Sequence, residues 1–495
     1  RDLHSFPTRR SSDLAMLEQR LEQIPIQTYK QLFVTGSGPG ILYGLPKLHK
    51  CDFAQSFRFR PIFAAYNTAS YKISKFLVPI LAPLTTNNYT VANSYSFVKK
   101  LHSINNADDL HMASFDITNL YTNIPLKETI AICLNKLFTT AATTVIGLNR
   151  NLFKTLLEHS VLNSFFMFNS ELYKQVEGVG MGLPLGPTFA NIFLCHHEIN
   201  WLNDCPETFK PVFYQRYIDD TFLLFNDKNH VQQFLDYVNV KHPNINFTVE
   251  NEKQGTLSFL DINISRSNNK FVTSVFRKDT FTGLGLSYFS FCCNRFKINA
   301  IKTLIHRAYN ISSNYLLLHQ EFEFLKSYFI NNGYPLFLIL SVIRKFLYNN
   351  FTVHDTGNNF TTHNPVKYIS LPFFGPQSEK MRSDLLKLLT KYCPTVNYKI
   401  VLSSSFKLGN FFKYKDSLPV FARSSVVYKY QCIQCDAEYV GSTHRTLHTR
   451  TCEHRGLSHR TELPLGAPPH SAVRLHCENV CGALPRTSGF KIIGH

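Results

Sequence analysis

The sequence contains no hydrophobic run long enough to cross a membrane. Its most apolar stretch, Pro335–Ile343, is nine residues long and is followed by Arg344 and Lys345, whereas a membrane helix needs roughly 18 apolar residues. We therefore expect no membrane partner. The chain also has no internal repeat and no long low-complexity tract. Because hydrophobic residues make up 44% of it, global disorder is excluded.

A disulfide framework is also absent. The twelve cysteines are scattered over 495 residues, unlike the dense cysteines of small secreted domains. The tight pair Cys432-x-x-Cys435 is better explained as part of a metal site. This pattern predicts a reducing compartment.

Acidic residues are few relative to basic ones. The chain has 34 Asp and Glu residues against 52 Lys and Arg residues, which gives a formal net charge of +18. A folded chain with this charge favours an acidic polymer, nucleic acid first, as its partner. A basic ribosome-like protein, or one whose charge serves only solubility, is the alternative at this point. The length predicts about three domains.

Residues 1–14, RDLHSFPTRRSSDL, lack both an initiator methionine and the apolar core of a secretory signal. They resemble translated read-through of a sequencing adaptor, so we exclude them from the fold. We expect the natural N-terminus to be missing from the sequence.

The order of apolar, polar and Gly/Pro segments predicts a mixed α+β fold. Residues 111–126 read as a strand that runs into a turn, and residues 211–226 as a hairpin. Helices are predicted over about 126–160, after Pro187 and over 230–240. The remaining predictions are strands at 165–176, 257–264 and 271–276, a Gly/Pro loop at 178–187, a basic helical block at 295–350 and a linker with a short helix at 351–400.

Three aspartates form the strongest chemical signal. Asp116 ends an apolar strand, and Asp219 and Asp220 lie at the tip of the predicted hairpin. Acidic residues at a hydrophobic turn are costly unless a cation binds there. Two divalent metals held by carboxylates can activate a primer 3′-hydroxyl and stabilise the leaving pyrophosphate. An ordinary Asp-Asp turn is the alternative, and it weakens because the neighbouring motifs agree in order and spacing.

Those motifs resemble a known enzyme family. FDITNLYTNIP at 115–125, GVGMGLPLGP at 178–187 and RYIDDTF at 216–222 resemble motifs A, B and C of reverse transcriptases. GLPKLHK at 44–50 and RFRPI at 58–62 precede them, and SFLDINI at 258–264 follows them. The combination, over roughly residues 40–495, is similar to the polymerases of Penelope-like retroelements, which are relatives of telomerase.

The resemblance implies a right-hand polymerase followed by a second domain. Fingers are expected in 15–110, a palm in 111–270 with a fingers insertion at about 126–176, and a thumb in 271–350. In that thumb, nine Lys and Arg residues stand against three Asp and Glu residues, which suits a grip on the duplex backbone. A linker at 351–405 and a C-terminal α/β nuclease domain at 406–495 are expected to follow.

The resemblance also assigns roles at the polymerase site. Asp116 and Asp219 are expected to bind Mg²⁺ or Mn²⁺, with Asp220 as the adjacent third carboxylate. Tyr121 resembles the steric gate that excludes a 2′-hydroxyl, although a core aromatic is the alternative. The basic residues Lys47 and Arg60 match those that hold the incoming triphosphate, and a solvated basic surface is their alternative.

The Gly/Pro loop and two further residues complete the expected site. Glycines allow a loop to approach the template–primer closely, and Pro187 suits the first position of a helix. Asn191 could touch template or nucleotide, and Lys253 is a weaker candidate for the general acid. The loop residues singled out are Gly180, Gly182, Pro184 and Gly186.

The last block resembles a GIY-YIG endonuclease, a domain that often follows the polymerase in Penelope-like elements. The resemblance rests on VVY at 426–428 and YVG at 439–441, with Arg450 and His454 on one helix face. Tyr428, Tyr439 and His454 are expected to activate water or position the phosphate, Gly441 completes the motif, and Arg450 neutralises developing charge. VVY replaces the usual Gly-Ile-Tyr. The family's metal-binding Glu is expected beyond His495, so the fragment is expected to lack nuclease activity; Glu478 lies too early to match.

A zinc clip is expected inside the same block. Cys432 and Cys435 need two more ligands for a closed tetrahedral site. His476 and Cys481 are preferred, because SAVRLH at 471–476 resembles the family segment with the next ligands. His470 and Cys477 are alternative ligands. If no zinc binds, Cys432 and Cys435 are expected to be a reduced pair in a β-hairpin.

The sequence therefore predicts a nuclear retrotransposon polymerase. It would copy element RNA into DNA from a primer made by nicking the target DNA, using deoxynucleoside triphosphates. A decayed or domesticated nucleic-acid-binding protein and a telomerase-like polymerase are the alternatives. The intact aspartates argue against the first, and the nuclease-like block argues against the second.

Overall fold

The computed structural model describes residues 32, 38–47, 59–66, 68–139, 144–162, 164–169, 171–351, 366–404, 420–459, 461–468 and 470–494. Predictions on the other residues, among them the adaptor-like 1–14 and Arg58, lie outside the described residues. Among the described residues, no helix has both the length and the hydropathy to cross a bilayer.

A four-stranded antiparallel sheet, here called the central sheet, organises the first half of the chain. Its strand order is β10 (Phe247–Asn251), β3 (His111–Ile117), β9 (Asp220–Phe225), β8 (Phe213–Tyr217). Because successive side chains of a strand point to opposite faces, β9 feeds two hydrophobic cores: Leu223 and Phe225 enter one, and Phe222 and Leu224 the other. The predicted hairpin at 211–226 is therefore present and is buried on both faces.

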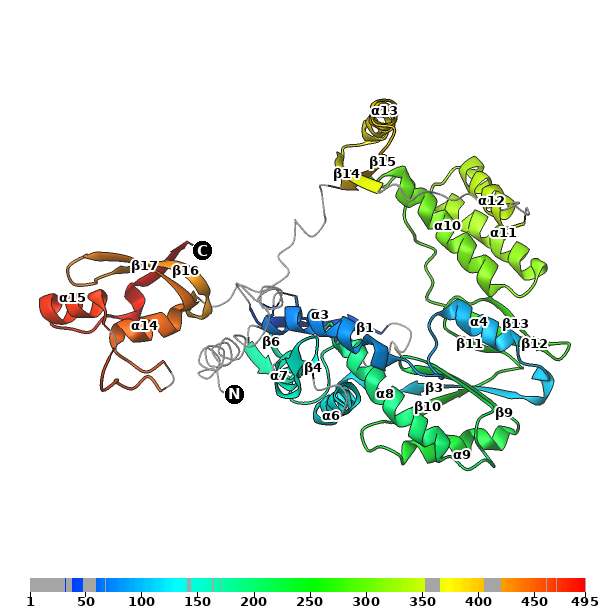
Figure 1. The fold of residues 1–495 in the computed structure, drawn as a ribbon, viewed down its shortest axis with the longest axis horizontal. Helices are drawn as coiled ribbons and strands as arrows, with labels where there is room; N and C mark the ends of the chain where they lie inside the picture. Colours follow the sequence, from blue (N-terminus) through cyan, green and yellow to red (C-terminus); the bar gives the residue numbers. More distant parts are fainter. Residues whose placement is uncertain are drawn as a thin grey trace.

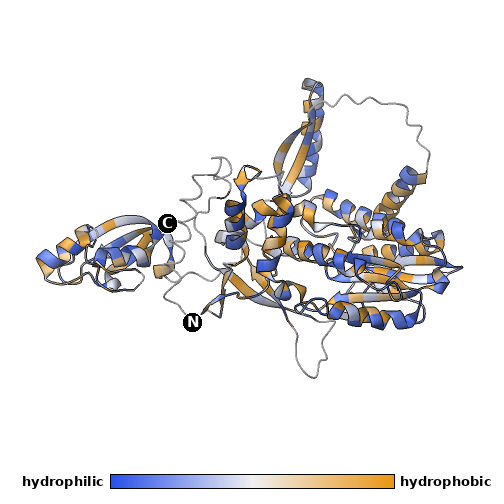
Figure 2. Ribbon diagram, turned by 60° about the horizontal axis from the view of Figure 1, so that its bottom comes forward, coloured by the Kyte–Doolittle hydropathy of each residue, from blue (hydrophilic) through white to orange (hydrophobic). Residues whose placement is uncertain are grey.

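Helices cover one face of the central sheet, and a helix with a small sheet covers the other (Figure 1). The helices on the first face are α8 (Gly186–Asn203) and α9 (Lys228–Asn239). The same hydrophobic core extends beyond the sheet to α3 (Ala69–Leu81), α6 (Leu126–Leu137) and α7 (Arg150–Val161). The opposite face carries α4 (Ser94–His102) and the sheet β11 (Leu257–Phe259), β12 (Ile262–Ser267), β13 (Lys270–Val275). The buried residues of α9, Val231, Phe234, Leu235 and Val238, follow the helical repeat, as packing on one side requires. Figure 2 shows hydrophobic and hydrophilic residues mixed along the helices.

The helix predicted over about 126–160 is two helices. α6 ends at Leu137, and α7 begins at Arg150 after Asn149, whose side-chain oxygen accepts the backbone N–H of Leu152 at 2.9 Å. Asn is a strong N-terminal cap because its side chain satisfies a helix N–H that has no partner in the helix. The cap starts a new helix at this point.

A second sheet holds the expected triphosphate-binding residues. Its order is β2 (Phe59–Ala64), β1 (Gly40–Pro46), β6 (Phe165–Phe168), β7 (Glu171–Lys174). β1 and β2 are antiparallel neighbours and β1 and β6 are parallel. Residues 40–46 and 165–174 thus meet in one sheet.

The basic helical block forms a three-helix bundle with a core of its own. Its helices are α10 (Asn294–Ile311), α11 (Tyr315–Asn331) and α12 (Leu336–Phe351). Asn314 caps α11 by accepting the N–H of Leu317 at 2.9 Å. The core of the bundle is distinct from the two cores of the central sheet, but Ile311 at the end of α10 packs into the core on the α4 side.

Much of the predicted linker is folded. Residues 366–404 form two parallel strands, β14 (Val366–Phe373) and β15 (Asn397–Ser404), joined by the 17-residue helix α13 (Pro376–Tyr392). Phe373 and Leu402 pack with Cys293, and a carboxylate oxygen of Glu379 accepts the N–H of Asn294 at 3.1 Å. The prediction of a linker with a short helix is wrong here, because this unit buries apolar residues at the start of α10.

The C-terminal domain is a small α/β unit. Its antiparallel sheet has the order β17 (Glu438–Thr446), β16 (Ser424–Gln431), β18 (Phe490–Gly494). Two helices complete it, α14 (Leu447–Arg455) and α15 (Ala472–Cys481). The shorter elements of the chain are α5 (Leu120–Asn123), β4 (Thr144–Val145), β5 (Leu148–Asn149), η3 (Ala82–Thr85), η4 (Ala107–Asp109), η6 (Val420–Ala422) and η7 (Thr487–Gly489).

Candidate functional site

The three aspartates meet at one end of the central sheet. Asp116 on β3 lies directly opposite Asp220 on β9, and the carbonyl of Asp219 accepts the N–H of Ile117 at 3.2 Å. All three residues are half-buried. Like charges directly across a strand pair destabilise a sheet, and a carboxylate cluster of this kind is a binding place for divalent cations. The sequence motifs 100 residues apart therefore build one acidic site.

The turn that presents Asp219 has a strained backbone. Tyr217 pairs with Asp220, so Ile218 and Asp219 are the two central residues of a tight turn. Ile218 has a φ of 58°. A β-branched residue rarely adopts this conformation, and such strain persists only where the surroundings hold it.

Tyr121 belongs to the same site. It lies on the short helix α5, directly after β3. Burial raises the pKa of its phenol, the Asp219 carboxylate raises it further, and the Arg60 guanidinium lowers it. The phenol therefore lies within electrostatic reach of both a predicted metal ligand and a predicted triphosphate-binding residue.

The two predicted basic residues lie at the same end of the β1–β2 pair. Arg60 pairs with Leu45 on β1, and Lys47 directly follows Pro46, the partner of Phe59. Arg60 is exposed and Lys47 is half-buried. Because Arg60 also influences Tyr121, this end of the sheet faces the aspartates.

The Gly/Pro loop is held between α5 and β2. Val179 donates its N–H to the carbonyl of Tyr121 at 2.7 Å, and Phe63 donates to the carbonyl of Met181 at 2.6 Å. Gly182 has a φ of +114°, and a Cβ there would lie 2.3 Å from the carbonyl oxygen of Phe63. Gly178, with a φ of +68°, approaches the backbone of Thr122 as closely. Glycine is required at both positions.

Two residues with weaker predicted roles, Asn191 and Lys253, lie in different environments. The Asn191 side chain accepts a hydrogen bond from Arg216 at 2.9 Å, so the protein itself uses its carbonyl oxygen. Lys253 is exposed and follows Asn251, the partner of Ala113, whereas Asp116 pairs with Thr248. At about 3.3 Å per residue, Lys253 lies on the order of 16 Å along the strand from that pair. The fold therefore gives no support to Lys253 as the general acid, and that assignment stays a prediction.

Sequence reasoning missed the residues beneath the turn. Arg216 is fully buried and Glu198 is 1% exposed. A buried ion pair beneath an acidic hairpin is a candidate functional signal, but the two residues are 18 positions apart in the sequence and only the fold brings them together. The sequence signal was an arginine within the apolar hairpin.

The predicted residues of the C-terminal domain also come together. The Tyr428 hydroxyl lies 2.7 Å from Nε2 of His454, and Nε of Arg450 donates to the same hydroxyl at 3.1 Å. The rings of Tyr439 and His454 have centroids 5.6 Å apart. A Cβ on Gly441 would lie 2.7 Å from the Tyr428 hydroxyl, which explains the glycine in this motif.

His454 is held as a neutral imidazole. Burial, followed by the charge of Arg450, lowers its pKa to about 4. Its Nδ1 lies 2.7 Å from the Ser471 hydroxyl, which also caps α15. The ring contacts two hydroxyl groups and holds that of Tyr428 in place, but with a pKa of about 4 it is a weak base at neutral pH.

Four predicted ligands form a candidate metal centre. Cys432, Cys435, His476 and Cys481 place their ligand atoms within 4.8 Å of one another. The sulfur of Cys481 lies 3.7 Å from that of Cys432 and 3.5 Å from that of Cys435. Ligand atoms in a tetrahedral thiolate site stand about 3.8 Å apart, given bonds of about 2.3 Å. The donor set therefore fits a tetrahedral cation, although no specific metal is shown.

The thiols of this cluster are tuned in opposite directions. The backbone N–H groups of Gln434 and Cys435 lower the pKa of Cys432 to about 6, so it is a thiolate at neutral pH. The neighbouring sulfur atoms of Cys435 and Cys432 raise the pKa of Cys481. The alternative ligand Cys477 instead contacts the Tyr430 hydroxyl at 3.3 Å.

A second cluster joins Glu128, His197 and His242. The Glu128 carboxylate lies 2.7 Å from Nε2 of His197 and 3.2 Å from Nε2 of His242. The backbone N–H of Asn244 points to Nδ1 of His242 at 3.1 Å, so the proton of that imidazole is on Nε2. A metal-bound histidine needs the reverse arrangement. The cluster is thus a hydrogen-bonded clamp between α6, α8 and the chain before β10.

Residues 49–288 match the family model of the reverse transcriptase (RNA-dependent DNA polymerase). This segment is a reverse transcriptase domain. It contains the central sheet, the three aspartates and the Gly/Pro loop. Residues 285–344 match a second model, the animal helix-turn-helix domain, which covers most of the three-helix bundle.

Solved structures similar to the chain include apo telomerase from Candida tropicalis, at 12% identity and a TM-score of 0.38, covering 64% of this chain and 59% of that one. Telomerase from Candida albicans in complex with a fragment of telomeric RNA is 13% identical, with a TM-score of 0.35 and coverage of 70% and 68%. The Sicinivirus RNA-dependent RNA polymerase is 11% identical, with a TM-score of 0.39 and coverage of 62% and 69%.

These likenesses are too slight to indicate what the chain acts on. The chain spans 56% to 59% of the length of two of the C. tropicalis telomerase structures. No curated protein matches it.

Replacing Gly182 by alanine should impair the reverse transcriptase domain more than it destabilises it. The new Cβ would push the loop away from Phe63, and a displacement of about 1 Å in an active site can lower the rate about 10²-fold. Gly255→Ala is the matched control, because Gly255 also has a positive φ, +70°, but has nothing within 4 Å of its Cβ position. Primer-extension rates and melting temperatures measure both; equal rates would contradict the role of the close approach.

The C-terminal domain should lose stability as the pH falls below about 6.5. The folded domain holds His454 neutral down to a pKa of about 4, whereas an unfolded histidine binds a proton near 6.5. Protonation of the unfolded chain then favours unfolding, by at most about 1.4 kcal/mol per pH unit. Melting of the full chain from pH 7.5 to 4.5 measures this, and His454→Gln should flatten the profile. An unchanged slope in that variant would contradict the assignment.

Proposed function

We propose that the chain is the RNA-directed DNA polymerase of a Penelope-like retrotransposon, which copies element RNA into DNA from a nicked target. The observation that carries the proposal is the meeting of Asp116, Asp219 and Asp220 at one end of the central sheet. The order of the motifs and the C-terminal domain behind the polymerase support the Penelope-like subtype. Its substrates would be an RNA template, a DNA primer and deoxynucleoside triphosphates.

The polymerase site has the ligands that a pair of Mg²⁺ or Mn²⁺ ions requires. Asp116 and Asp219 would hold the ions, with Asp220 beside them. Bound ions would supply activation of the primer hydroxyl and stabilisation of the leaving pyrophosphate. Lys47 and Arg60 would bind the triphosphate through its negative charge. Tyr121, close to both groups, would exclude a nucleotide that carries a 2′-hydroxyl.

The three-helix bundle would serve as the thumb. Residues 271–350 carry an excess of basic residues, and basic side chains grip the phosphate backbone without reading its sequence. The helix-turn-helix match of residues 285–344 is in keeping with a nucleic-acid contact. Binding should therefore weaken as salt is raised.

The C-terminal domain would be part of a DNA-nicking domain of the GIY-YIG kind. The support is the contact of Tyr428 with both His454 and Arg450. Tyr428 and His454 would position a water molecule, and Arg450 would neutralise charge on the phosphate. The nick would supply the 3′-hydroxyl to the polymerase on the same chain. Because chromosomal DNA would be the target, the nucleus is the proposed location.

Primer extension tests the proposed polymerase function. The full chain receives an RNA template, a DNA primer, deoxynucleotides and Mg²⁺ or Mn²⁺. The expected result is extension that Asp219→Ala with Asp220→Ala abolishes, because the metal ligands are removed. Ribonucleotides, tested in parallel on Tyr121→Ala, should be accepted better than by the unaltered chain.

The matched control carries Asp108→Ala with Asp109→Ala, a second Asp-Asp pair that lies before β3, at the end of that strand away from Asp116. It should extend primers at the rate of the unaltered chain. No extension by the unaltered chain, with salt-sensitive binding of RNA and DNA retained, would indicate a decayed or domesticated binding protein instead.

We propose Zn²⁺ as the cation of the four-ligand cluster, which joins the turn after β16 to α15. Elemental analysis should find about one zinc per chain, and Cys435→Ser should lose it, because a structural zinc site needs all four ligands. Cys393→Ser, outside the cluster, is the control. Chelation should expose the C-terminal domain to proteolysis. Equal zinc content in the two variants would contradict this assignment.

A further inference from the structure

Arg216 uses every donor of its guanidinium inside the protein. Its Nε donates to Glu198 at 2.5 Å, and Nη2 donates to Glu198 at 3.4 Å and to the sulfur of Cys195 at 3.3 Å. Its Nη1 donates to the side chain of Asn191 at 2.9 Å and to the carbonyl of Ile218 at 3.0 Å. A guanidinium has five N–H groups, and five acceptors surround this one.

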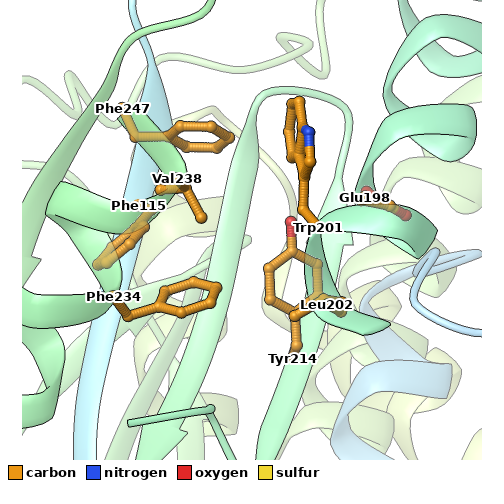
Figure 3. A pocket seen from close by; sticks show the side chains of 8 residues that line it. All are labelled: Phe115, Glu198, Trp201, Leu202, Tyr214, Phe234, Val238 and Phe247. Atoms are coloured by element: carbon orange, nitrogen blue, oxygen red, sulfur yellow. The ribbon is translucent and has the colours of Figure 1, made fainter. Parts of the chain in front are cut away.

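The pair of Arg216 and Glu198 is buried within the molecule. Glu198 borders a small cavity of ≈ 10 Å³, which is room for about one water molecule. Figure 3 shows Trp201 and Tyr214 facing Phe115, Phe234 and Phe247 across it. Asn87 also donates to the carboxylate, at 2.6 Å. Burial lowers the pKa of Arg216, but the charge and hydrogen bonds of Glu198 raise it by more. The pKa of Arg216 therefore lies above its ordinary value.

Stability alone does not account for such a pair. A buried ion pair is often no more stable than apolar residues of similar volume. What apolar residues could not supply is a donor to the carbonyl of Ile218, the residue with the strained φ directly before Asp219. The same guanidinium holds Asn191 and Glu198 on α8, which follows the Gly/Pro loop. It therefore links the turn to the helix of the neighbouring motif.

We infer that Arg216, anchored by Glu198, is the positioning residue that fixes the Ile218–Asp219 turn and so the spacing of the three carboxylates for metal binding. This inference rests on the proposed metal-dependent polymerase function of the aspartates. Arg216 is fully buried and bonded within the protein, so it would act through the backbone of Ile218. Lysine would not replace it, because an ammonium has three donors on a flexible stem rather than a planar fork.

The test replaces the pair without leaving a buried charge. Arg216→Met with Glu198→Leu keeps an apolar volume in place of the ion pair, a change that is often neutral for stability. Arg266→Met with Glu252→Leu is the matched control. That ion pair joins β12 to the chain after β10, and Glu252 bonds the N–H of Met112, at the end of β3 away from Asp116.

Four quantities are measured on the full chain: melting temperature, affinity for primer–template, Mn²⁺ affinity by electron paramagnetic resonance, and kcat with the Mn²⁺ dependence of extension. In the Arg216/Glu198 variant we expect Mn²⁺ affinity to fall about tenfold and kcat about 10²-fold. Melting temperature and primer–template affinity should stay near those of the control. A variant with normal Mn²⁺ affinity and normal kcat would overturn the inference.

A milder single substitution keeps the inference testable if the double variant does not fold. Asn191→Ala removes one acceptor of Nη1 but leaves the ion pair intact, and it should lower Mn²⁺ affinity by a smaller factor in the absence of nucleotide. If Asn191→Ala leaves that affinity unchanged, the inference fails. If the unaltered chain does not extend primers, the proposed function fails. The Mn²⁺ affinity, compared with that of Asp219→Ala, then still decides the role of Arg216.

Discussion

Repulsion among three carboxylates is the constraint around which the polymerase half of the chain is built. Asp116 stands opposite Asp220, and Asp219 occupies the adjoining turn, so the folded chain brings together charges that destabilise a sheet. The two hydrophobic cores that sandwich the sheet resist this repulsion. The turn at Ile218 and Asp219 is held instead by buried polar contacts, such as that of Arg216 with the carbonyl of Ile218. The result is an acidic site prepared before any cation arrives, as electrostatic preorganisation requires.

Segments far apart in the sequence close around that site through backbone contacts. The Gly/Pro loop donates to the chain at Tyr121 and accepts from β2, which leaves no room for side chains at Gly178 and Gly182. Basic residues of the second sheet and a phenol after β3 thereby share one electrostatic neighbourhood. A polymerase site needs such close assembly, because phosphoryl transfer depends mainly on position and charge.

The sequence allowed prediction of what depends on local pattern and motif order. The hairpin of Asp219 and Asp220 and the cysteine and histidine cluster near Cys432 lie where they were expected. Contacts between residues that are distant in the sequence could not be predicted, because no local pattern links Arg216 to Glu198 or to Asn87. The break between α6 and α7, which ends at the cap Asn149, and the folded 366–404 segment were also missed. A helix cap and a small buried patch decide these structures, and neither gives a strong signal in the sequence.

The central claim is that the three aspartates form a site for divalent metal ions. The most direct measurement is anomalous X-ray scattering from Mn²⁺ in a crystal of the chain with an RNA template, a primer that lacks its 3′-hydroxyl and the next deoxynucleotide. The account predicts anomalous peaks beside Asp116 and Asp219, absent from a crystal of Asp219→Ala with Asp220→Ala. Ordered primer and nucleotide without a peak at these carboxylates would contradict it.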